Sequence, residues 1–129
     1  MNKIHHTSID RTPSFVSRSS YLVEGLLAAA IFFGGLGTAG IYWDVGWHRT
    51  IGRDTFLSPP HLLLYIGVAA NGLIALLAVI GVIRDPDRLP EFGPDIQGPF
   101  GNRLPLGFLV LGLGVAVVLA TAPLDEFWH

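Results

Sequence analysis

Three long apolar runs without a charged side chain constrain the fold of this chain more than any other feature. They cover residues 25–43, 62–83 and 104–124. About 20 consecutive apolar residues form a helix long enough to cross the ~30 Å hydrocarbon core of a bilayer. We therefore predict an all-α integral membrane protein whose three transmembrane helices lie at about residues 21–43, 62–83 and 104–124, all within one domain at residues 21–129.

The overall composition agrees with a membrane protein and excludes several other classes. Only 14% of the residues are charged, whereas soluble domains carry about 25%. The net charge is -2, and Lys and Arg do not cluster, so the chain has no positive patch that would attract nucleic acid. No nucleic-acid partner is therefore expected. The chain has no cysteine, so any metal site must use nitrogen and oxygen ligands.

The distribution of basic residues predicts the orientation in the membrane. Residues 1–20 are polar and read as a cytoplasmic tail; a cleaved signal peptide is the alternative, but the run that follows is longer than a typical signal-peptide core. Six basic residues flank one side of the predicted spans and two flank the other: Lys3, Arg11, Arg18, Arg84, Arg88 and Arg103 against Arg49 and Arg53. We therefore predict a multi-pass protein of a bacterial-type cytoplasmic (inner) membrane, with a cytoplasmic N-terminus and the 44–60 loop on the periplasmic side.

The spans also carry signals for helix packing. A cluster of small residues at 34–40 predicts a surface that another helix can approach closely. Asn71 near the middle of the second span predicts an interhelical hydrogen bond, with a ligand or substrate contact as the alternative. The Pro- and Gly-rich segment 84–103 is expected to be an irregular loop. Pro105 is expected in the first turn of the third span, where proline is tolerated.

A polar stretch between the first two spans, residues 43–61, holds a candidate metal site. Asp44 and His48 are four residues apart, so on a helix they share one face. Pro59-Pro60 is a natural helix start directly before His61. We predict that Asp44, His48 and His61 bind a metal ion at the outer membrane edge, with a fourth position open. The plain alternative is an aromatic belt with polar groups and no ion.

Two neighbouring charges and a second copy of the motif extend this prediction. Arg53 and Asp54 either form a salt bridge that stabilises the loop, or they orient one of the metal ligands without binding the metal themselves. The C-terminal TAPLDEFWH aligns with GIYWDVGWH at an offset of 81 residues, so that Asp125 and His129 match Asp44 and His48. We interpret this as one and a half copies of a two-helix repeat, with the start of a second site and a chain that continues in a longer protein.

The stretch WHRTIGRDTFLSPPH resembles a segment of the C subunit of particulate methane and ammonia monooxygenases, which has the form WHxTIxRDTxFxPxH. The matching residues are Trp47, His48, Thr50, Ile51, Arg53, Asp54, Thr55, Pro59 and His61. The resemblance implies that Asp44, His48 and His61 bind copper, with zinc as the other metal considered. It covers about 18 residues; the family's C subunit has more spans, and Phe56-Leu57 is displaced by one residue relative to the pattern.

Two functions follow as hypotheses. The first is a copper-binding membrane subunit, which by resemblance belongs to a copper-dependent monooxygenase (an oxidoreductase) and contacts other membrane subunits or further copies of itself. The second is an accessory or scaffolding subunit of a membrane complex with a structural metal or none. A haem held between His48 and His61 is a third, more distant reading.

Overall fold

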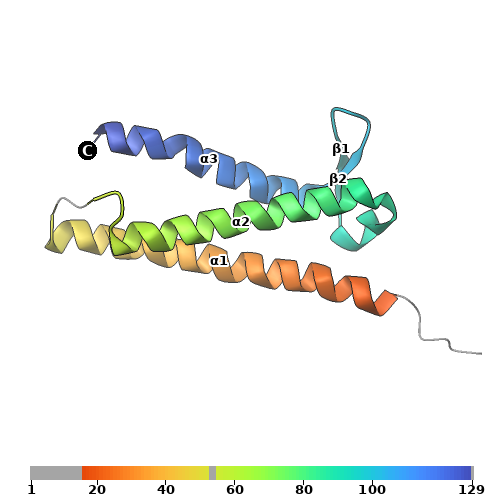
Figure 1. The fold of residues 1–129 in the computed structure, drawn as a ribbon, viewed down its shortest axis with the longest axis horizontal. Coiled ribbons are helices and arrows are strands. Elements are labelled where there is room, and N and C mark those ends of the chain that lie inside the picture. Colours follow the sequence, from red (N-terminus) through yellow and green to blue (C-terminus); the bar gives the residue numbers. More distant parts are fainter. Residues whose placement is uncertain (1–15, 53–54, 129) are drawn as a thin grey trace, which may run out of the picture.

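The computed structural model describes residues 16–52 and 55–128, and three helices dominate it. The elements in chain order are α1 (Val16–Thr50), α2 (Pro59–Arg84), the 3-10 helix η1 (Pro86–Phe92), β1 (Asp95–Gln97), β2 (Arg103–Pro105) and α3 (Leu106–Trp128). Helix α2 lies antiparallel to α1 and also contacts α3 (Figure 1). The end of α1, the start of α2 and the end of α3 lie at one end of the molecule, with the hairpin at the other (Figure 1).

The turn between α1 and α2 follows from local sequence. The backbone N–H of Ile51 donates to the carbonyl of Trp47 at 2.8 Å, and Gly52 then adopts a φ of 89°. Glycine enters this left-handed conformation without steric strain, which ends the helix. Helix α2 begins after an extended Ser58, with proline in its first positions as predicted.

Two of the three predicted spans are confirmed as helices long and apolar enough to cross a membrane. Within the described residues these are Tyr21–Thr50 and Pro59–Arg84. The apolar part of α3, Leu106–Thr121, is shorter, so the third span stays a prediction. Helix α1 continues past Trp43, where the first span was expected to end, and therefore carries Asp44 and His48 on its last turns.

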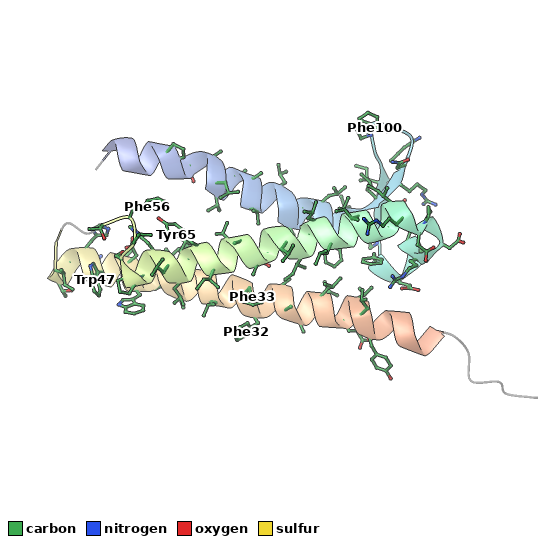
Figure 2. The ribbon with its side chains drawn as sticks, viewed as in Figure 1. Phe32, Phe33, Trp47, Phe56, Tyr65 and Phe100 are labelled. Atoms are coloured by element: carbon green, nitrogen blue, oxygen red, sulfur yellow. The ribbon has the colours of Figure 1, made fainter. Side chains whose placement is uncertain are left out.

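Large apolar side chains are exposed along the helices. Ile31 and Phe32 on α1 are 76% and 65% exposed, and Val110 on α3 is 61% exposed. Phe32 points away from α2 (Figure 2). So much apolar surface is stable only against lipid or another protein. The small buried core lies toward the hairpin end, where Phe92 meets Phe108 edge to face at 5.7 Å.

The segment 84–103 is not the irregular loop that we predicted. It folds into η1 and an antiparallel hairpin whose register pairs Asp95 with Pro105 and Gln97 with Arg103. The Arg103 guanidinium donates to the Asp95 carboxylate from Nη2 to Oδ1 at 2.8 Å. Pro105 therefore ends a strand directly before α3 instead of lying in its first turn. The all-α prediction holds for the helices and missed this two-stranded sheet.

The interhelical hydrogen bond predicted for Asn71 is not present among the described residues. Asn71 is 7% exposed, and its Nδ2 donates to the carbonyl of Gly67 in its own helix at 3.1 Å. Across the helix contact stands Gly34, which has no side chain to accept a hydrogen bond. The Oδ1 atom of Asn71 is buried and has no hydrogen-bond partner among the described residues.

Candidate metal centre

The turn between α1 and α2 brings Asp44, His48 and His61 together. The first two residues lie one turn apart on α1, and the third lies in the first turn of α2. One ligand atom from each residue lies within 4.8 Å of the others, which is close enough to hold a metal ion. The structure therefore brings together all three residues that spacing had indicated.

The carboxylate of Asp44 lies between the two imidazoles. Its Oδ2 is 3.6 Å from Nε2 of His48, and its Oδ1 is 3.2 Å from Nε2 of His61. The side chains are half-buried, with 25% of Asp44, 29% of His48 and 15% of His61 exposed. Both imidazoles thus direct their Nε2 atoms toward the carboxylate of Asp44.

The other nitrogen of His61 is held by the turn. Its Nδ1 lies 3.2 Å from the carbonyl oxygen of Thr55. A carbonyl only accepts, so Nδ1 carries the hydrogen and donates it. Nε2 is then the nitrogen available for a ligand bond, an arrangement that metal-binding histidines commonly use. The same carbonyl accepts the backbone N–H of Ser58 at 2.9 Å, which fixes its direction.

The Oδ1 atom of Asp44 carries the argument for a cation. It is buried, and no donor among the described residues makes a hydrogen bond to it, even though Nε2 of His61 is only 3.2 Å away. Burying a carboxylate oxygen without a hydrogen bond is unfavourable. A positive charge between the oxygen and the nitrogen, either a proton on the imidazole or a metal ion, removes that penalty.

Aromatic rings cover one side of the centre. The Tyr65 ring stacks on the His61 imidazole at 6.0 Å with 28° between their planes, and the Phe56 ring lies 5.0 Å from that of Tyr65. Trp47 and Trp43 meet edge to face at 6.2 Å on α1. Phe56, Tyr65 and Trp47 gather at this end of the molecule (Figure 2). These rings place the centre beside aromatic, largely apolar side chains.

The structure does not test the remaining predicted site residues. Arg53, Asp54 and His129 lie outside the described residues. Asp125 lies in the last turns of α3, which run toward the same end of the molecule as the centre (Figure 1). Their roles in orienting ligands or in starting a second site stay predictions.

Two contributors were missed by sequence reasoning. Tyr65 follows His61 by four residues, and this helical spacing signals a shared face. The Thr55 carbonyl has no sequence signal, because any residue could supply it. The haem reading is disfavoured, since a macrocycle between the two imidazoles would occupy the place of Asp44.

Comparisons of the chain with protein-family models, curated proteins and solved structures give no match.

Proposed function

We propose that this chain is a membrane subunit that binds a copper ion through Asp44, His48 and His61, related to the C subunit of copper membrane monooxygenases. The observation that carries the proposal is the buried Oδ1 of Asp44, which accepts no hydrogen bond from the described residues and lies 3.2 Å from Nε2 of His61. The sequence resemblance supplies the choice of metal and of family.

The ligand spacing suits a small transition metal. Ligand bonds of about 2.0–2.1 Å place neighbouring atoms of a tetrahedral site about 3.3 Å apart. The two separations from Asp44, 3.2 Å from Oδ1 to His61 and 3.6 Å from Oδ2 to His48, are close to that value, and one ligand atom from each residue lies within 4.8 Å of the others. Among divalent metals, copper binds such nitrogen and oxygen donors most tightly, with zinc below it. Three protein ligands leave a position for water or substrate.

In an assembled complex, bound copper would supply oxidation chemistry with dioxygen for a small apolar molecule that arrives through the bilayer. The residues of this chain hold the ion, fix the His61 tautomer and cover the centre with aromatic rings. The excess of basic residues in the N-terminal segment and the 84–103 segment supports an inner-membrane protein with its centre on the periplasmic side.

The second candidate is an accessory or scaffolding subunit. The exposed apolar faces of α1 and α3 favour it, because they offer surface for other membrane subunits or for further copies of this chain. In this case the centre holds a structural metal or none. Substitution of the ligand residues then disrupts assembly of the complex, or has no effect, and does not selectively lower the turnover of an assembled complex.

Metal content tests the first proposal. Protein purified in detergent without chelator is analysed by mass spectrometry beside a His48→Ala/His61→Ala variant. A His5→Ala/His6→Ala variant serves as the control with the same loss of two histidines. We expect about one copper per chain in the wild type and the control, and none in the His48/His61 variant. Zinc at the same stoichiometry would overturn the copper assignment, and no metal after addition of copper would overturn the centre and favour the scaffold.

A further inference from the structure

We propose that Gly40 is a positioning residue that sets the distance between Asp44 and His61, and with it the metal affinity of the centre. The inference rests on the proposed metal site and adds a residue that has no ligand atom. Gly40 lies one helical turn before Asp44, on the α1 face that also carries Gly37 and His48.

Among the glycines of α1, Gly40 is the one at which an added Cβ would come nearest to α2. A Cβ atom at Gly40 would lie 2.8 Å from the backbone nitrogen of Leu64 and 3.0 Å from the carbonyl oxygen of Pro60. His61 lies between these two contact residues. The surface of Gly40 thus rests on the segment of α2 that carries the third ligand.

A methyl group at Gly40 cannot be accommodated by the movement of a side chain alone. The atoms that it would meet belong to the backbone of α2, which cannot rotate away as the end of a side chain can. Ordinary contact begins at 3.4 Å, so a contact of 2.8 Å forces the helices about 0.6 Å apart or tilts them. Metal–ligand distances in proteins lie within about 0.2 Å of their usual values, so a shift of this size in one ligand moves it out of that range.

Gly46 provides a matched control on the same helix. It lies between Asp44 and His48 in the sequence and is therefore nearer to the ligands, but a Cβ there would meet no atom within 4 Å. Gly40→Ala and Gly46→Ala make the same chemical change and raise helix propensity equally. Only the first change brings a new atom against α2.

The first experiment measures copper affinity by competition titration, together with the Cu(II) electron paramagnetic resonance spectrum. We expect Gly40→Ala to bind copper about 10- to 100-fold more weakly and with changed hyperfine coupling, the loss typical when the support of a ligand is disturbed. We expect Gly46→Ala to match the wild type in both. Equal affinity and equal spectra for all three proteins would overturn the inference.

A second variant separates positioning from general damage to the fold. Asp44→Glu adds one methylene to the carboxylate and lets it reach across a wider gap. In the Gly40→Ala background we expect this change to recover part of the lost affinity, whereas in the wild-type background it weakens binding. A double variant that binds no better than Gly40→Ala alone would overturn positioning as the cause.

A distance measurement tests the inference without metal. Solid-state NMR dipolar recoupling between ¹³C-labelled aspartate and ¹⁵N-labelled histidine, in metal-free protein in lipid that also carries His48→Ala, reports the Asp44–His61 separation without the nearby Asp44–His48 pair. We expect weaker coupling in Gly40→Ala and wild-type coupling in Gly46→Ala. Unchanged coupling in Gly40→Ala overturns the inference, whether or not the wild type binds copper. Absence of copper from the wild type overturns the proposed function alone.

Discussion

At the scale of single residues, the centre depends on one carboxylate shared by two imidazoles. Asp44 approaches both Nε2 atoms, and its buried Oδ1 accepts no hydrogen bond from the part of the chain that the structure describes. A bound ion would therefore stabilise the folded chain as well as occupy the site, because a ligand that binds only the folded state shifts the unfolding equilibrium.

The change Asp44→Asn tests this dependence, since it keeps the shape of the side chain and removes its charge. We expect the copper affinity to fall by at least about 100-fold, because a neutral amide replaces an anionic ligand and disturbed ligand support alone costs 10- to 100-fold. We also expect copper to raise the unfolding temperature of the wild type and not of the variant. Thermal unfolding in detergent with and without copper checks both points, and equal stabilisation of the two proteins would contradict them.

Asn71 offers a second residue-scale prediction. Its amide donates only to its own helix and leaves a buried oxygen unsatisfied. Asn71→Leu, which keeps the branched shape and the number of side-chain heavy atoms, removes the unsatisfied oxygen and should lower the free energy of unfolding by less than about 1 kcal/mol or raise it. Unfolding in mixed micelles measures the change. A loss of several kcal/mol would mean that Asn71 anchors the helices after all.

The three ligand residues could be predicted from the sequence because helical spacing places Asp44 and His48 on one face, and a Pro-Pro pair starts a helix at His61. The partner of Asn71 could not be predicted in the same way. A side-chain amide in a helix can donate to the carbonyl four residues earlier, and the pattern does not reveal that the facing residue, Gly34, has no side chain to bond with it.

At the scale of elements, α1 and α2 approach each other through glycines. A Cβ at Gly67 would lie 2.7 Å from the carbonyl oxygen of Phe33 and 2.8 Å from the Cα of Gly37. The predicted small-residue surface is confirmed at Gly37 and Gly40. By contrast, the hairpin after η1 was missed because its strands have three residues each, too few to show an alternating pattern.

The glycine contact predicts a stability difference between two variants on α2. Gly67→Ala should destabilise the fold by about 1–3 kcal/mol, the usual effect of overpacking. Gly81→Ala should be neutral or stabilising by up to about 1 kcal/mol, because a Cβ there meets no atom within 4 Å and alanine favours the helix. Unfolding in mixed micelles compares them, and equal stabilities would contradict the close backbone contact.

At the scale of the whole molecule, the metal centre and the hairpin lie at opposite ends of the helices (Figure 1). If the helices cross a bilayer, the two ends face different compartments. Orientation then follows from the basic residues, which gather in the N-terminal segment and in residues 84–103. The lengths of the apolar runs predict helices that connect two opposite ends of the molecule. The described apolar part of α3 is too short to show whether this helix also crosses the membrane.

Labelling with a membrane-impermeant thiol reagent tests the arrangement, because the chain has no cysteine of its own. Leu57→Cys in the turn beside the centre and Phe100→Cys in the hairpin each introduce one thiol at a side chain that is 67% and 89% exposed. In spheroplasts we expect the Leu57→Cys protein to react at once and the Phe100→Cys protein only after the membrane is permeabilised. Equal reaction of both before permeabilisation would contradict a membrane between the two ends. The reverse order would keep the spanning helices and invert the orientation, placing the Asp44–His48–His61 centre on the cytoplasmic side.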